Sequence, residues 1–277
     1  MLMFPSHVRL GPLISTMASN AAWLSEDEFP SHQRAADEVE RVLSFAEVKG
    51  QFERFLPQLK GPAMSRNSAL AELRVAYYFD RNQFHIVEWE PPGEGLKKGE
   101  FAIEGPSHER IFVEIKNPGW RGELREEEVV AGRRNQPKNI NGEARFVGSW
   151  QNIQQMMDRA YPKFAVNQRN LLVIVDDFFV SLQYGPEWYA GNALYSCTEG
   201  RFANRNCERL GAAAFFWVET DKSYDIRLYL NPFALGSTAM PEDFSSAFHG
   251  EVFKDVNLPP PDAKAKVQSS IVLTDLL

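Results

Sequence analysis

Residues 99–116 read GEFAIEGPSHERIFVEIK, and this stretch decides the fold that the sequence predicts. It contains two short runs rich in Phe, Ile and Val, which are typical of β-strands. The segment between them, 105–109, is polar and includes Gly and Pro, so it suits a hairpin connection. We therefore expect residues 99–104 and 110–116 to form an antiparallel hairpin.

The register of this hairpin follows from the positions of its charged residues. If Glu104 pairs with Arg110, the same register places Glu100 opposite Glu114. Phe101 then faces Val113 and Ile103 faces Ile111, which gives one apolar face, and the polar face holds Glu100, Glu114 and Lys116. Two directly opposed carboxylates lie only about 5 Å apart at Cβ and repel each other, at a cost of up to roughly 1 kcal/mol. A divalent cation would reverse the sign of that interaction, so this pair is a candidate metal site.

The composition limits the class of protein. The chain has 277 residues, of which 44% are hydrophobic and 12% aromatic, which is enough for a sizeable core. A net charge of −7 argues against a surface that binds nucleic acid everywhere, although a local basic groove is compatible with it. Cys197 and Cys207 lack metal-ligand spacing and favour a reducing compartment. No apolar run approaches the about 20 residues of a membrane span, and the first residues do not read as a signal peptide, so we expect a cytoplasmic protein without membrane association.

The rest of the chain alternates between helical and strand-like patterns. Three segments have helical apolar spacing and four have strand-like runs: 31–60, 64–80 and 149–164 for helix, and 84–89, 170–176, 212–219 and 225–230 for strand. Gly50 and Pro57 interrupt the first helical segment, so one helix or two fit equally. The run at 170–176 is apolar throughout and indicates a strand buried on both faces. This order favours an α/β fold with a mixed central sheet flanked by helices.

The same patterns predict three parts of the chain. Residues 1–63 would form an N-terminal helical arm, and 64–235 would form the α/β core. Residues 236–277 include three consecutive prolines at 259–261 and would form an extension that packs on the core.

Three pieces of sequence, in this order, resemble a known family. Ala71-Glu72-Leu73-Arg74, Gly99-Glu100-Phe101 and Val113-Glu114-Ile115-Lys116 are similar to the motifs of the PD-(D/E)XK nuclease superfamily, over about residues 64–176. The resemblance implies a restriction-endonuclease-like core and an endonuclease that hydrolyses phosphodiester bonds with Mg²⁺, or alternatively Mn²⁺, with DNA as the favoured substrate. The family usually has Pro-Asp where this chain has Gly99-Glu100; glutamate keeps the charge but moves the carboxylate outward by one methylene.

The resemblance also implies a role for each candidate catalytic residue. Glu100 and Glu114 would hold the cation, because Mg²⁺ prefers hard oxygen ligands. Lys116 would orient the attacking water or stabilise charge in the transition state, and the alternative is a strand-end lysine paired with either carboxylate. Glu72 would reach the metal through water. Its alternative is an exposed glutamate at the edge of the apolar stripe of its helix, or one paired in the neighbourhood of Arg74.

Candidate nucleic-acid contacts follow the second strand of the hairpin. Residues 117–147 hold six basic and five acidic side chains, and among them we expect Arg121, Arg133 and Arg134 to contact phosphate. The alternative is that residues 117–147 form a surface loop with balanced charge. In the family, a Gln or Lys of the helix corresponding to 149–164 contacts the site or a phosphate, which selects Lys163 as a further candidate.

Two function classes therefore compete. The first is a metal-dependent nuclease. The second is a catalytically inactive module of the same fold that binds nucleic acid or a protein partner, and the glutamate at position 100 and the acidic net charge favour it. A homodimer is compatible with either class.

Overall fold

The computed structural model describes residues 2–21, 29–117, 149–176, 190–204, 206–219, 221–248 and 251–253. The helices are α1 (Phe29–Val48), α2 (Phe52–Leu59), α3 (Ala63–Arg81), α5 (Ser149–Ala160) and α7 (Glu242–Ala247). Short turns of 3₁₀ helix occur at Ile14–Thr16 and Tyr161–Lys163, and a π-helical turn at Gly191–Tyr195. The strands are β1 (Leu2–Pro5), β2 (Ala18–Ala21), β3 (His85–Trp89), β4 (Phe101–Glu104), β5 (Arg110–Lys116), β6 (Arg169–Asp176), β7 (Ala212–Val218), β8 (Tyr224–Leu230) and β9 (Glu251–Phe253).

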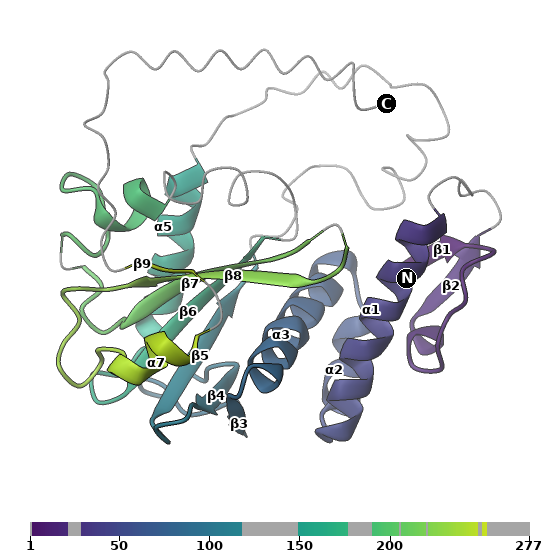
Figure 1. The fold of residues 1–277 in the computed structure, drawn as a ribbon, viewed down its shortest axis with the longest axis horizontal. Coiled ribbons are helices and arrows are strands. Elements are labelled where there is room, and N and C mark those ends of the chain that lie inside the picture. The colour runs from purple at the N-terminus through teal and green to yellow at the C-terminus, as the bar shows by residue number, and fades with distance from the viewer. Residues whose placement is uncertain are drawn as a thin grey trace, which may run out of the picture.

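Seven of these strands form one mixed sheet, in the order β3-β4-β5-β6-β7-β8-β9. Strands β5, β6 and β7 are parallel, and β4 and β8 run antiparallel to their neighbours β5 and β7. Helices α1 and α2 lie beyond α3, and the separate β1–β2 pair lies farthest from the sheet (Figure 1). The predicted α/β fold with a mixed central sheet flanked by helices is confirmed.

The β4–β5 hairpin has the predicted register. Glu104 pairs with Arg110, and the apolar pairs of the two strands face each other as expected. Glu100 directly precedes β4, and its backbone N–H donates to the carbonyl of Val113 at 3.1 Å. The carboxylates of Glu100 and Glu114 are therefore brought to the same end of the hairpin.

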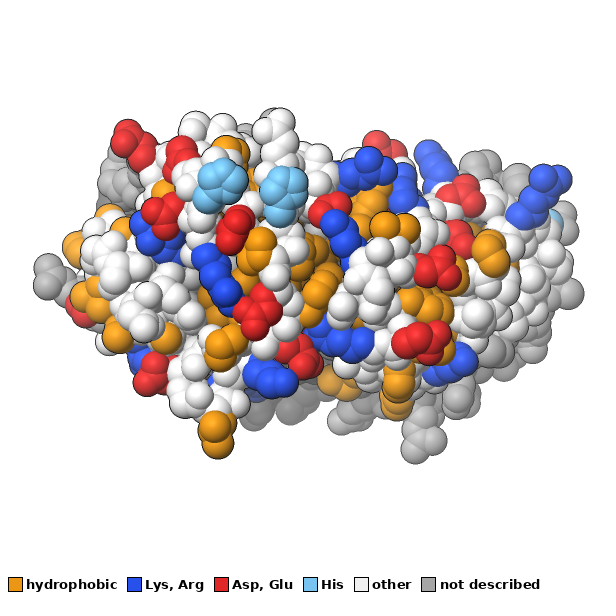
Figure 2. Space-filling model, turned by 90° about the horizontal axis from the view of Figure 1, so that it is seen from below, with side chains coloured by type: hydrophobic (Ala, Val, Ile, Leu, Met, Phe, Trp, Pro, Cys, Tyr) orange, Lys and Arg blue, Asp and Glu red, His pale blue; other side chains and the backbone are white. Residues whose placement is uncertain are grey.

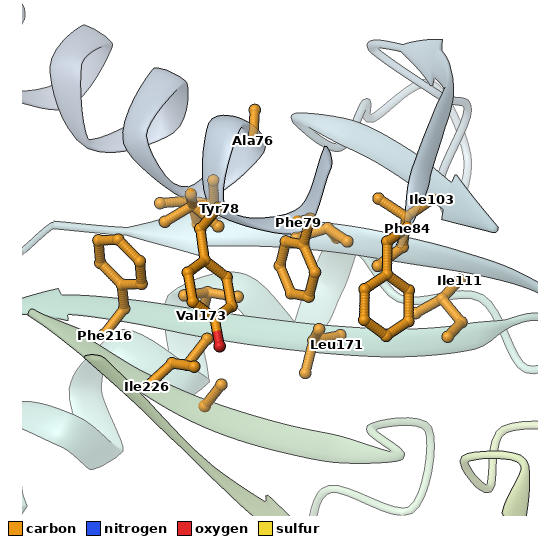
Figure 3. Close-up of a cluster of buried hydrophobic side chains, with 14 of the residues drawn as sticks. Ala76, Tyr78, Phe79, Phe84, Ile103, Ile111, Leu171, Val173, Phe216 and Ile226 are labelled. Carbon is orange, nitrogen blue, oxygen red and sulfur yellow. The ribbon is translucent and has the colours of Figure 1, made fainter. Parts of the chain in front are cut away.

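Both faces of the sheet are buried, because helices pack on each side. Ala76 and Phe79 of α3 pack on one face, where Leu171 and Val173 of β6 meet them (Figure 3). On the other face Phe112 of β5 packs with residues of α5 and of the 161–164 turn. The hairpin face that carries Glu114 is consequently buried over most of its length, and polar groups gather only at its end.

Helix α3 has apolar residues on two sides. Phe79 points to the sheet, whereas Leu70 and Leu73 are buried against α1 and α2. The segment predicted as one helix or two is two helices, because α1 ends before Gly50, which adopts a left-handed φ of 68°. This arrangement places α2 beside the half of α3 that carries Glu72. Among the described helices, none has the length and apolar character that crossing a membrane requires.

Candidate active site

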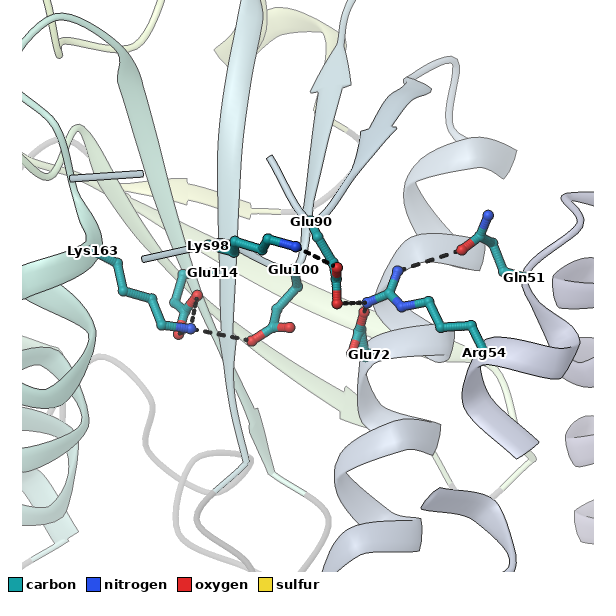
Figure 4. A network of polar contacts seen from close by, with 8 residues as sticks. All are labelled: Gln51, Arg54, Glu72, Glu90, Lys98, Glu100, Glu114 and Lys163. Atoms are coloured by element: carbon teal, nitrogen blue, oxygen red, sulfur yellow. Dashed lines mark hydrogen bonds and ion pairs between the residues drawn. The ribbon is translucent and has the colours of Figure 1, made fainter. Parts of the chain in front are cut away.

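Two carboxylates and two ammonium groups meet where β4 begins and β5 ends. The Nζ of Lys163 lies 2.7 Å from Oε1 and 2.9 Å from Oε2 of Glu114, and 3.6 Å from Oε1 of Glu100. The ammonium of Lys116 also donates to Oε1 of Glu114. The side chain of Glu114 is fully buried, while about a quarter of the Glu100 and Lys163 side chains is exposed. Lys163 therefore bridges the two carboxylates (Figure 4).

A second set of charged groups adjoins the first. Nη2 of Arg54, on α2, donates to Oε1 of Glu72 at 3.1 Å and lies 3.6 Å from Oε1 of Glu90. Glu90 in turn accepts a hydrogen bond from Nζ of Lys98 at 3.1 Å. The guanidinium also lies over the ring of Trp89, 5.4 Å from its centroid. Arg54 thus links the N-terminal helices to the edge of the sheet.

The loop between β3 and β4 fixes the position of the turn that carries Lys163. The N–H of Glu94 donates to the carbonyl of Lys163 at 2.9 Å, and Nζ of Lys97 donates to the carbonyl of Pro162 at 3.3 Å. Gly93 permits this close approach, because a Cβ at that position would lie 2.4 Å from the carbonyl oxygen of Lys163. The backbone of the turn is held in place, while the lysine side chain extends to the carboxylates.

Glu90 stands at a strained point of the backbone. Its φ of 53° is in the left-handed region, which residues other than glycine seldom adopt. Its N–H donates to the carbonyl of Glu100 at 3.0 Å, so the strained turn is tied to the start of β4. Strained residues of this kind gather at functional sites, where the surrounding structure enforces them.

Burial and neighbouring charges raise the pKa values of two carboxyl groups, Glu72 and Glu100. Burial, followed by the charge of Glu100, raises the pKa of Glu72 from its ordinary value of 4.5 to about 8, although Arg54 opposes the shift. Burial and then the charge of Glu114 raise the pKa of Glu100, against the opposing effect of the two lysines. For Lys163, burial by itself lowers the pKa, but Glu114 and Glu100 outweigh it and the pKa is raised. Perturbed groups clustered in this way are a feature of functional sites.

The structure brings together five of the residues that the sequence singled out. Glu100, Glu114, Lys116 and Lys163 are in direct contact, and Glu72 lies within electrostatic range of both carboxylates. The alternatives considered for Glu72 are wrong: the side chain is only 7% exposed, it pairs with Arg54, and Arg74 pairs instead with Glu38.

Arg121, Arg133 and Arg134 lie outside the described residues, and their role stays a prediction. Gln154, a polar residue of α5, the helix that precedes the turn with Lys163, is buried and donates to the carbonyl of Glu199. It therefore has a structural contact away from the carboxylates.

Three members of the cluster were missed by the sequence analysis. Arg54 comes from a helix assigned to the N-terminal arm, and Glu90 and Lys98 come from the loop between β3 and β4. None belongs to a spacing pattern, because their proximity depends on how α2 packs against α3 and on the left-handed turn at Glu90. No sequence pattern identifies Arg54. It is recognised only once the structure shows it as the basic partner of the buried Glu72.

The carboxylates have the chemistry that a hard cation requires, but basic side chains hold them. Among the residues that the structure describes, no group of three or more His, Cys, Asp or Glu side chains is arranged to hold a metal ion. Glu100 and Glu114 nevertheless offer oxygen ligands of the kind that Mg²⁺ prefers. The ammonium of Lys163 stands between them as a cation within ion-pair distance of both. The pair therefore fits a divalent cation if that ammonium moves aside.

The cluster contains equal numbers of acidic and basic side chains: Glu72, Glu90, Glu100 and Glu114 with Arg54, Lys98, Lys116 and Lys163. Acidic and basic side chains are likewise interspersed on the face of the molecule drawn in Figure 2, without a large region of one sign. A divalent cation added to this cluster would leave an excess of positive charge, which is suited to an anionic ligand.

Comparisons with known proteins add little to this description. No family model matches the chain, and no curated protein matches it. A solved structure of SfsA from Pyrococcus furiosus in complex with Ca²⁺ aligns with 58% of this chain, with 15% sequence identity and a TM-score of 0.22. The chain spans 60% of the length of that protein. Similarity this low supports no inference about fold, ligand or activity.

Proposed function

We propose that the chain is a metal-dependent nuclease that hydrolyses phosphodiester bonds in nucleic acid, with DNA as the expected substrate. The observation that carries the proposal is the convergence of Glu72, Glu100, Glu114 and Lys116 at one end of the sheet. Sequence patterns placed these four on one helix and two strands, and two of them, Glu72 and Glu100, have pKa values raised by burial and then by neighbouring carboxylates. A cluster of perturbed titratable groups of this kind is typical of functional sites.

The residues divide the work of the reaction. Glu100 and Glu114 would hold Mg²⁺ or Mn²⁺, which when bound polarises the phosphate and lowers the pKa of an attacking water. Lys116 keeps a positive charge at the bonded carboxylate, from where it can stabilise negative charge on the phosphate oxygens. Glu72, with a pKa of about 8, can hold or release a proton near neutral pH, which is the property of a general acid or base.

A second candidate function is supported by a different observation. The oxygens of Glu114 are already bonded to two ammonium groups, and Glu100 is paired with one of them. If these ion pairs never open, the carboxylates cannot bind a metal ion, and the chain keeps the fold but cannot hydrolyse phosphodiester bonds. It would then be a module that binds nucleic acid or a protein partner, as a monomer or a homodimer.

A cleavage assay tests the proposal. Purified protein is incubated with linear, circular and single-stranded DNA and with RNA, in Mg²⁺, Mn²⁺ or EDTA. We expect metal-dependent cleavage that falls by about two orders of magnitude or more in Lys116→Ala, because the variant loses a charge that acts on the transition state. Lys49→Ala is the matched control, since Lys49 also pairs with a carboxylate, Asp80 at 2.7 Å, but outside the cluster.

The outcomes separate the two functions. If the wild type and Lys116→Ala cleave equally, the assignment of this cluster as the active site is wrong. Absence of cleavage with every substrate and metal, together with binding of nucleic acid or of a partner, would favour the inactive module.

A further inference from the structure

The position of Lys163 suggests a property of the site beyond the proposed reaction. Its ammonium contacts both carboxylates, at 2.7 and 2.9 Å from the oxygens of Glu114 and 3.6 Å from Glu100. Lys116, in contrast, contacts Glu114 from its position two residues further along the same strand. Lys163 is thus the group that neutralises the repulsion between the two acids, which is the task the sequence analysis assigned to a divalent cation.

We propose that Lys163 and a divalent cation compete for Glu100 and Glu114, and that the displaced ammonium becomes available to a phosphate group of nucleic acid. The inference rests on the proposed function, because it concerns the same carboxylates. It goes further because it makes metal binding and nucleic-acid binding depend on each other. The ammonium of Lys163 pairs with the two carboxylates when no metal is bound, and it is available to a phosphate group when metal is bound.

Electrostatics favour the competition. Lys116 and Lys163 already share Oε1 of Glu114. A divalent ion on the same carboxylate would add strong repulsion, and the burial of Glu114 leaves little water to screen it. A divalent ion brings two charges to the pair where the lysine brings one. Lys163 contacts both carboxylates, whereas Lys116 contacts Glu114 alone, so Lys163 occupies the position between the two acids that the ion would take. Its departure costs part of the free energy that the metal gains.

The local structure allows the ammonium to move without disturbing the fold. The carbonyl of Lys163 accepts a hydrogen bond from Glu94, and that of Pro162 accepts one from Lys97, so the backbone of the turn is fixed. The flexible four-carbon side chain is about a quarter exposed and can turn toward solvent. Because the backbone of the turn is fixed, the displaced ammonium would remain within reach of the site, where it could contact a phosphate group.

Metal titrations test the competition directly. Mn²⁺ and Mg²⁺ are titrated by isothermal calorimetry into the wild type, Lys163→Met and Lys49→Met, after circular dichroism has shown that each is folded. We expect Lys163→Met to bind Mn²⁺ on the order of tenfold more tightly, because a competing positive charge at contact distance is gone. Lys49→Met removes the same charge from a lysine that pairs with Asp80 outside the cluster, and it should bind like the wild type. Equal or weaker binding by Lys163→Met would overturn the inference.

A measurement on the wild type covers the case in which Lys163→Met does not fold. An acetylating reagent modifies accessible lysines, and mass spectrometry reports the extent at each position. The ion pairs of Lys163 should protect it, and Mn²⁺ should increase its acetylation several-fold while that of Lys97 stays constant. If Mn²⁺ left the acetylation of Lys163 unchanged or lowered it, the inference would be wrong.

These tests do not depend on cleavage. If Lys163→Met binds metal more tightly but the wild type cuts no nucleic acid, the competition is supported and the proposed nuclease function is wrong. If cleavage requires metal but Lys163→Met binds metal like the wild type, the proposed nuclease function is supported and the proposed competition is wrong.

Discussion

At the scale of single residues, Glu72 determines how stability responds to pH. The carboxyl group is buried and lies close to Glu90, Glu100 and Glu114, with Arg54 as its basic partner. The folded state therefore keeps a proton on it up to a pH of about 8, whereas the unfolded chain releases that proton near its ordinary pKa of 4.5. Because the folded state binds the additional proton between these values, the free energy of unfolding falls as the pH rises through this window.

We expect Glu72→Gln to flatten this decline, because the neutral amide has no proton to lose. Without metal, the wild type should lose at most about 1.4 kcal/mol of unfolding free energy per pH unit from this group. Urea denaturation at pH 5, 6, 7 and 8 in the presence of EDTA measures it. Glu47→Gln is the control: it removes an exposed carboxylate on α1, and it should leave the decline in place. If the free energy of unfolding falls with pH equally in the wild type and in Glu72→Gln, Glu72 is not the cause of the decline.

At the scale of elements, the hairpin was the most predictable part of the structure. Alternating apolar residues fix which face of each strand is buried, so pairing Glu104 with Arg110 was enough to set the register. The position of Lys163 could not be found in this way. It depends on the docking of two loops 60 or more residues apart, which leaves no periodic pattern in the sequence.

The short outer strands escaped prediction for a related reason. Strands β1, β2 and β9 have four, four and three residues, too few for a period to be recognised. The site was predictable to the same extent as the fold. Residues on the hairpin and on α3 were found from their spacing, whereas Arg54 and Glu90 required the packing of α2 and a left-handed turn.

The docking of the β3–β4 loop on the 161–163 turn makes a prediction about Gly93. A methyl group there would meet the carbonyl oxygen of Lys163 at 2.4 Å and the ring of Phe112 at 3.2 Å. We expect Gly93→Ala to lower the free energy of unfolding by about 1–3 kcal/mol, as overpacking against backbone does. Gly236→Ala is the matched control, because a Cβ at position 236 has nothing within 4 Å. Urea denaturation measures both, and equal effects of the two substitutions would show that the loop is not tightly docked.

At the scale of the whole molecule, a buried ion pair joins the N-terminal helices to the sheet. Nε and Nη2 of Arg74, on α3, each donate to the carboxylate of Glu38, on α1, at 2.9 Å. The hydroxyl of Tyr224, on β8, donates to the same carboxylate. Arg74 and Tyr224 hold the pKa of Glu38 low despite its burial, which by itself would raise it. The division at residues 63 and 64 stays a prediction, and these contacts indicate that the parts on either side stabilise each other.

We therefore expect the N-terminal helices and the sheet to unfold together. Glu38→Ala would leave the guanidinium of Arg74 buried without its carboxylate, which costs about 3–5 kcal/mol. If the two parts form one cooperative unit, far-ultraviolet circular dichroism and tryptophan fluorescence should give coincident urea transitions in the wild type. Both should then shift by the same amount in Glu38→Ala. Glu47→Ala, an exposed position on α1, should leave them in place. A transition that shifts for one probe alone would mean that the N-terminal helices form a separate unit, and Arg54 would then reach the carboxylates from a domain able to move away from them.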